Sequence, residues 1–114
     1  MPATKKKSKP SSQSRILALI AKIPPGKVST YGAIARAAGI PNGARQTARA
    51  LHCAHGVPWH RVLGAGGAIK LPGEHAFEQR FRLQSEGVTF RGRKVDMKRH
   101  EHKFPSVARR AKPF

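Results

Sequence analysis

The sequence contains one cysteine, only five acidic residues and no long apolar segment. Because Cys53 is alone, no disulfide can form within the chain. The longest strongly apolar run, residues 16–23, is interrupted by Lys22 and falls short of the roughly 20 residues needed to cross a bilayer. Residues 1–10 hold lysines without the apolar stretch of a secretory signal. These scarcities predict a cytoplasmic protein that makes no use of a membrane.

The scarcity of acids leaves a large positive charge. Lysine and arginine total 23, and the net charge is +18 over 114 residues, a length suited to one compact domain. Such a charge favours a polyanionic partner. Bases gather at both ends: residues 1–15 hold five and no acid, and residues 91–114 hold nine against two acids. We predict a basic flexible arm over 1–14, one domain over 15–98 and a basic flexible tail over 99–114.

Helical patterns dominate between the charged ends, so the expected class is mainly α with a minor β part. Glycines at 64, 66 and 67 predict a turn after which residues 68–71 pair back as a small wing. Within the last predicted helix, Phe77, Phe81 and Leu83 are expected to face inward. The predicted helices cover 13–22, the residues from the cap Thr30 to the stop Gly39, 43–52, and 74–85. The predicted extended pieces cover 27–29, 88–90 and 94–97.

The second and third predicted helices are separated by a tight turn at Ile40, Pro41 and Asn42. On the third helix, Arg45 and Arg49 are four residues apart and therefore project from the same face. Small residues around them allow close approach to a partner. This arrangement is typical of a winged helix-turn-helix-like DNA-binding domain.

The stretch VPWHRVL places Trp59, the only tryptophan, between a proline and a His-Arg pair. An indole offers a large flat face and one hydrogen-bond donor. From the residues alone, Trp59 either fills the core or lines a binding site.

Three stretches carry a family resemblance: IPPGKVSTYGAIARAAGIPNGARQTARAL, PWHRVLGAGGAIKLPG and LQSEGV. Together they resemble the DNA-binding domain of the alkylguanine-DNA alkyltransferases over residues 16–96. That family carries a Pro-Cys-His-Arg-Val active-site motif, and here Trp59 occupies the cysteine position. The substitution is similar to that of the alkyltransferase-like proteins, which bind alkylated guanine without repairing it. The loop over 68–75 departs from the alkyltransferase pattern, so its pocket contacts are not carried over.

The chemistry of Trp59 agrees with that resemblance. Removing an alkyl group by direct transfer needs a thiolate, and an indole has no lone pair for the attack. An aromatic wall can instead stack against a base turned out of the duplex. We therefore expect a non-enzymatic sensor of O6-alkylguanine in double-stranded DNA, with no cofactor and no metal. The expected alkylguanine pocket consists of Trp59, Tyr31, His60, Pro58 and Arg61, with His60 in a structural role.

The resemblance also implies how DNA is held. Tyr31 would meet the phosphate of the target nucleotide, and Arg45 would enter the minor groove and fill the gap left by the flipped base. Further DNA contacts are expected from Thr30, Asn42, Gly43, Ala44, Thr47, Ala48 and Arg49. The protein is expected to act as a monomer that marks the lesion for nucleotide excision repair, in the nucleoid of a bacterium or the nucleus of a eukaryote.

Two alternatives remain open. The chain could be a helix-turn-helix regulator that reads an undamaged operator, or an active alkyltransferase that uses Cys53. Metal binding is disfavoured because His52, Cys53 and His55, like His100 with His102, lack the spacing of a four-ligand zinc site.

Overall fold

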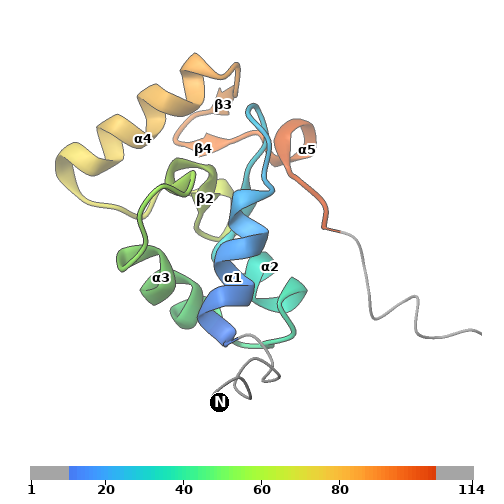
Figure 1. The fold of residues 1–114 in the computed structure, drawn as a ribbon. Coiled ribbons are helices and arrows are strands. Elements are labelled where there is room, and N and C mark those ends of the chain that lie inside the picture. Colours follow the sequence, from blue (N-terminus) through green and yellow to red (C-terminus); the bar gives the residue numbers. More distant parts are fainter. Residues whose placement is uncertain (1–10, 105–114) are drawn as a thin grey trace, which may run out of the picture.

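A computed structural model describes residues 11–104 of the chain (Figure 1). The mainly helical class with short strands is confirmed. The helices are α1 (Ser12–Ala21), α2 (Tyr31–Ala37), α3 (Ala44–His52), α4 (Gly73–Ser85) and α5 (Met97–His100), with 3₁₀ turns η2 (Trp59–Arg61) and η3 (Ala65–Gly67). The strands are β1 (Ser29–Thr30), β2 (Val62–Leu63), β3 (Phe90–Arg91) and β4 (Lys94–Val95).

The helix starts follow from capping side chains. The hydroxyl of Ser11 accepts a hydrogen bond from the Ser14 amide at 3.0 Å, which starts α1. Thr30 caps α2 in the same way, because its Oγ1 accepts from the Ala33 amide at 3.1 Å. The predicted role of Thr30 as a cap is therefore confirmed.

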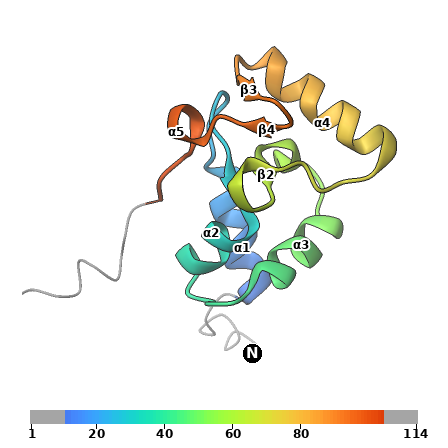
Figure 2. The same cartoon turned by 180° about the vertical axis from the view of Figure 1, so that it is seen from behind.

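The helices α1, α2 and α3 form one half of the molecule around a shared apolar core (Figure 2). The connection between α2 and α3 contains Asn42 in the left-handed region, at φ 64°. The next residue must be glycine, since a Cβ at Gly43 would lie 2.5 Å from Cγ2 of Ile40. This tight connection fixes how α3 projects from the body, as in a helix-turn-helix unit.

A short parallel pairing joins this half to the centre of the molecule. Ser29 of β1 pairs with Val62 of β2, and Thr30 pairs with Leu63. Because α2 begins directly after β1, the pairing brings Tyr31 close to Gly64, which follows β2. Residues that are 33 positions apart in the sequence are thus paired.

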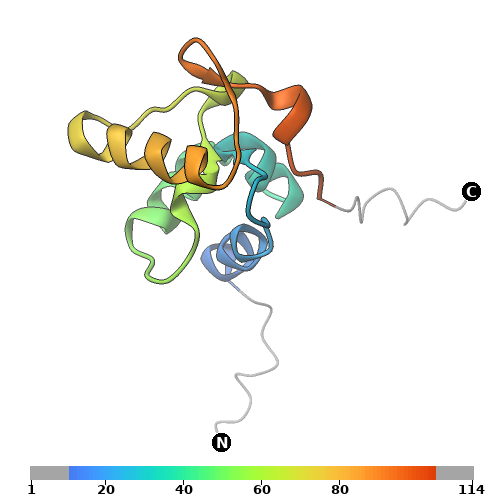
Figure 3. The same ribbon diagram turned by 90° about the horizontal axis from the view of Figure 1, so that it is seen from above.

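The other half contains α4, the antiparallel β3–β4 hairpin and α5. Figure 3 shows α4 and α5 on opposite sides, with the hairpin between them. Its core contains Val28, Leu63, Leu83, Val88 and Val95. The predicted return of the chain after the glycine turn is present only at Ala68, whose carbonyl accepts from the Gly64 amide at 2.7 Å, because residues 69–71 form no strand.

Two predictions in this half are wrong. Phe77 and Phe81 do not face inward, since 75% and 61% of their surfaces are exposed. The buried side of α4 instead carries Gln79 and Leu83, and positions two apart on a helix point in nearly opposite directions. Met97 begins α5 rather than continuing a strand.

The packed structure extends beyond the predicted limits of 15 and 98. Helix α1 already begins at Ser12. Val28 donates to the His100 carbonyl at 2.9 Å and accepts from the His102 amide at 2.7 Å, so the chain after residue 98 packs on the domain. Seven basic residues of the predicted arm and tail lie outside the described residues, namely Lys5, Lys6, Lys7, Lys9, Arg109, Arg110 and Lys112, whereas Arg99 and Lys103 of the predicted tail lie within the described part. Within 11–104, none of the helices combines the length and apolar character that crossing a bilayer requires.

Replacing a buried and an exposed side chain of α4 by alanine should lower the free energy of unfolding by unequal amounts. Leu83→Ala removes a fully buried side chain, so we expect the free energy of unfolding to fall by about 2 to 5 kcal/mol. Phe77→Ala removes an exposed side chain and should change it by no more than about 0.5 kcal/mol. Urea denaturation followed by circular dichroism measures both. Equal losses in the two variants would contradict the observed orientation of α4.

Candidate nucleic-acid interface

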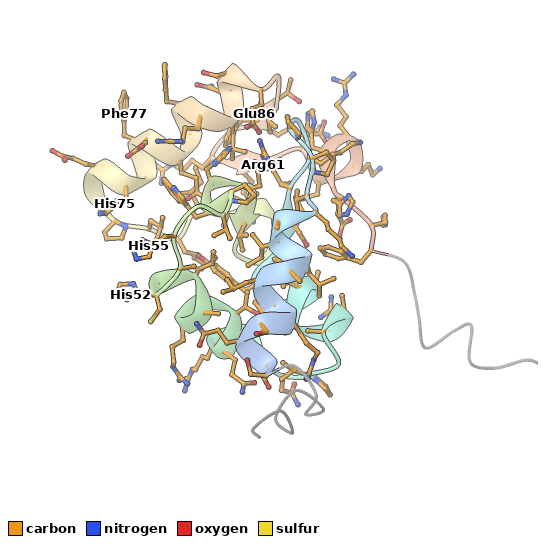
Figure 4. The ribbon with its side chains drawn as sticks, in the orientation of Figure 1. His52, His55, Arg61, His75, Phe77 and Glu86 are labelled. Carbon is orange, nitrogen blue, oxygen red and sulfur yellow. The ribbon has the colours of Figure 1, made fainter. Side chains whose placement is uncertain are left out.

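Glu86 connects three separate parts of the chain. Its Oε2 lies 2.8 Å from Nε2 of His60 and accepts from Nη2 of Arg61 at 2.6 Å. Its Oε1 accepts from Nε of Arg61 at 3.0 Å and from the Gly26 amide at 3.3 Å. Arg61 also donates through Nη1 to the Ile23 carbonyl at 2.9 Å. The turn η2 is thereby fixed to the loop after α1 and to the end of α4, and Figure 4 shows Arg61 and Glu86 side by side.

The charge state of Glu86 follows from these contacts. Burial alone would raise the pKa of its carboxyl, but hydrogen bonds from Arg61, His60 and the Gly26 amide outweigh burial and lower the pKa to about 2. An ionised carboxylate can only accept, so Nε2 of His60 carries the proton and donates. His60 is 93% buried, with 7% of its surface exposed. These contacts agree with the structural role predicted for His60.

The backbone of η2 has a second anchor in Gln79 of α4. This buried side chain donates through Nε2 to the carbonyls of His60 and Val62, at 3.1 and 2.8 Å. The residues next to Trp59 are therefore tied to the interior through both side chains and backbone. Pro58 precedes the turn and is partly exposed.

Trp59 itself lies outside the interior. It is partly exposed and belongs to neither of the apolar core clusters. The His60 ring meets the indole edge-on, with centroids 6.1 Å apart and an interplanar angle of 83°. Cζ of Arg82 lies 5.7 Å from the indole centroid. The turn η2 thus carries an indole that is partly exposed and is not part of either apolar core cluster.

The exposed side of α3 carries most of the residues predicted to contact DNA. Arg45, Ala48 and Arg49 are exposed, as are Asn42 and Ala44 at the start of the helix. Two predicted contacts need correction, because Gly43 and Thr47 are buried. Gly43 forms the tight connection before the helix. The Thr47 hydroxyl donates a hydrogen bond to the Gly43 carbonyl at 3.4 Å. Neither Gly43 nor the Thr47 side chain is therefore accessible to DNA.

A groove of about 570 Å³ opens beside the start of α2. Arg36 and Lys70 supply positive charge to its lining, whereas Glu101 is acidic. The lining residues are Thr30, Tyr31, Gly32, Arg36, Ala44, Gly64, Ala65, Gly66, Lys70, Met97 and Glu101. The groove therefore runs between the starts of α2 and α3 on one side and the wing and α5 on the other.

Tyr31 lies in this groove with part of its ring against the core. Burial raises the pKa of its phenol, so the group stays protonated at neutral pH and can donate a hydrogen bond. Trp59 does not line the same groove. The five residues predicted to form one pocket are thus divided: Tyr31 faces the groove, Trp59 and Pro58 lie near the surface, and His60 and Arg61 face Glu86.

Among the histidines singled out from the sequence, His52 ends α3 and His55 follows it, whereas His100 ends α5 and His102 follows that helix. Figure 4 shows His52 and His55, at and after the end of α3, in line with His75 at the start of α4. Cys53 is a free, exposed thiol. Within the described part of the chain, no three histidine, cysteine or acidic side chains gather closely enough to hold a metal ion.

Sequence reasoning missed several residues of this region. Glu86 is one of only five acids in a strongly basic chain, and that rarity was the available signal. Gln79 is a polar residue on the apolar side of α4, which hints at backbone hydrogen bonds. Arg36 and Lys70 carry no local pattern, because the groove that they line is assembled from distant segments.

Comparisons with known proteins point to one family. A family profile described as 6-O-methylguanine DNA methyltransferase, DNA binding domain, matches residues 11–88. The chain is 46% identical over 80 residues to Alkyltransferase-like protein 1 of Schizosaccharomyces pombe, covering 66% of this chain and 74% of that protein. It is 37% identical over 105 residues to the DNA base-flipping protein of Escherichia coli, covering 88% and 81%. The fold matches S. pombe Atl1 in complex with damaged DNA containing O6-carboxymethylguanine, with a TM-score of 0.69, 35% identity and coverage of 82% and 95%.

The lowered pKa of Glu86 predicts a loss of stability in acid. The folded state favours the ionised carboxylate, so its contribution is full above the ordinary value of 4.5 and disappears as the pH falls towards about 2. We expect this group to account for about 2 to 3 kcal/mol of the acid-induced loss. Glu86→Gln should lose stability at neutral pH and show a flatter decline in acid.

Urea denaturation at a series of pH values measures this effect. Glu74→Gln removes an exposed acid from the same region and is the matched control. An acid decline in Glu86→Gln as steep as that of Glu74→Gln would contradict the assigned role of Glu86.

Proposed function

The chain belongs to the 6-O-methylguanine DNA methyltransferase family, whose DNA-binding domain it matches over residues 11–88, and we propose that it senses O6-alkylguanine in duplex DNA without repairing it. The observation that carries this proposal is the placement of Trp59. The residue that occupies the nucleophile position of the Pro-Cys-His-Arg-Val motif is an indole near the surface, held by a rigid turn. It offers a stacking face and no sulfur.

Base flipping needs compensation for the lost stacking and pairing, which amounts to a few kcal/mol. Arg45 is exposed near the start of α3, where a helix-turn-helix protein meets DNA. A planar guanidinium can stack in the vacated space and hydrogen-bond to the orphaned base. We assign Arg45 to this role and Trp59 to the everted base.

The groove beside α2 fits the sugar-phosphate backbone. Its cations Arg36 and Lys70 attract phosphate, and the protonated phenol of Tyr31 can donate to a phosphate oxygen. Arg49, one turn after Arg45, is a further phosphate contact. The net charge of +18 supports binding to any duplex through counterion release, and the bases outside the described residues, four over 1–10 and three over 105–114, add to it.

Binding without repair requires a second system to remove the lesion. We propose that the protein binds as a monomer and that the complex of the protein with distorted DNA marks the site for nucleotide excision repair. The names of the relatives, Alkyltransferase-like protein 1 and DNA base-flipping protein, support the recognition step.

Three substitutions separate lesion reading from general DNA binding. Trp59→Ala should lower affinity for an O6-methylguanine duplex by roughly 5- to 150-fold, the loss of one stacked base, while binding to the matched guanine duplex changes little. Arg45→Ala should weaken lesion binding and abolish unstacking of the target. Arg49→Ala should weaken binding to both duplexes alike. It should also lower the slope of log affinity against log salt concentration by about one.

Fluorescence anisotropy of labelled duplexes gives the affinities, and 2-aminopurine next to the lesion reports unstacking. An undamaged operator bound more tightly than any lesion duplex would favour the sequence-specific regulator. Equal effects of Trp59→Ala on both duplexes would contradict the proposed reader.

The intact mass of the protein tests the enzymatic alternative. Cys53 is an exposed thiol directly after α3. After incubation with an excess of O6-methylguanine duplex, we expect the mass to stay unchanged. A gain of one methyl group that Cys53→Ala abolishes would show alkyl transfer to that thiol.

A further inference from the structure

Arg82 of α4 is the cationic neighbour of the proposed reader. Its Cζ lies 5.7 Å from the centroid of the Trp59 ring, within the range of a cation–π contact. His60 meets the same indole edge-on, at 6.1 Å. The indole therefore has one neighbour from its own turn and one from a helix that follows it in the chain.

The guanidinium of Arg82 is itself held in place. Its Nε and Nη2 both donate to Oε2 of Glu78, one helical turn earlier, at 2.8 and 2.6 Å. About half of each side chain is exposed, 48% for Arg82 and 46% for Glu78. Exposed pairs of this kind add little to folding stability. The contact instead fixes the direction in which Arg82 points.

We propose that Arg82, oriented by Glu78, is a positioning residue that holds the indole of Trp59 in the arrangement that accepts the damaged base. This inference rests on the proposed function. The cation attracts the electron-rich indole ring, which restricts its rotation and leaves the remaining surface of the ring for stacking. A ring ordered before binding loses less conformational freedom when the base arrives. The gain applies only to a base that reaches Trp59, so it favours the lesion over undamaged DNA.

The same helix supplies a matched control. Arg80 is also an arginine of α4, but its Cζ lies 4.2 Å from the centroid of Phe90. Arg80→Ala and Arg82→Ala remove the same charge two residues apart, and only Arg82→Ala removes the cation beside Trp59. Glu78→Gln keeps Arg82 and weakens the contact that orients it.

The test uses the full chain and two readouts. Because Trp59 is the only tryptophan, its fluorescence anisotropy decay reports its mobility without a label. Arg82→Ala should enlarge the fast component of the decay and lower the ratio of affinities for O6-methylguanine and guanine duplexes by about two- to fivefold, the range for an exposed cation–π contact. Glu78→Gln should act in the same direction and less strongly. Arg80→Ala should leave the decay and the ratio unchanged, although both affinities fall.

The outcomes separate this inference from the proposed function. If the wild-type protein binds both duplexes equally, the proposed function and the positioning role of Arg82 are both overturned. If the wild type prefers the lesion and Arg82→Ala keeps the ratio and the decay, only the positioning role fails. A rise in lesion affinity in Arg82→Ala would also overturn it, because Arg82 would then occupy the surface that the base needs. The midpoint of thermal unfolding should be the same in all variants, which shows that a changed ratio does not come from a damaged fold.

Discussion

The carboxylate of Glu86 is the contact on which the position of the site depends. It binds two consecutive side chains of η2, His60 and Arg61, and also the amide of Gly26. Four donor nitrogens from three residues converge on one ionised group in a partly buried setting, where such bonds are strong. The residue directly before these two side chains is Trp59, whose backbone therefore has little freedom. An acid at the end of α4 thus determines where an aromatic ring at the surface can stand.

This arrangement gives His60 a purpose that does not require a thiol. With a proton on Nε2 directed to Glu86, the imidazole serves as a structural donor. The His-Arg pair therefore has a structural role that does not depend on the residue before it. The elements to which we assign the DNA contacts are organised separately, through the tight connection at Gly43 and the groove beside Tyr31. Reading of the base and grip on the backbone are assigned to different parts of one small domain.

Local patterns predicted the helices well because their signals are local. The cap Thr30 and the stop Gly39, which adopts φ 82°, set the two ends of α2 through adjacent residues. Failures arose where long-range packing decides. Phe77 and Phe81 looked like core residues by type, but α4 turns its opposite side inward and leaves them exposed.

The site residues show the same difference between local signals, which the sequence reveals, and long-range contacts, which it does not. Arg45, Arg49 and Trp59 stood out by spacing, rarity and resemblance, and all three are at least partly exposed. Thr47 was misassigned because the sequence does not show that its hydroxyl returns to the backbone of its own helix. Glu86, Gln79 and Arg82 were missed because each acts across a distance in sequence, on a segment that only the fold brings near.

The central claim is that an everted, alkylated purine stacks on Trp59. The emission of this single tryptophan during titration with duplex DNA tests it most directly, because a stacked base quenches an indole. We expect saturable, strong quenching with an O6-methylguanine duplex and weak quenching with the matched guanine duplex at equal occupancy. The same quenching by both duplexes would contradict the account.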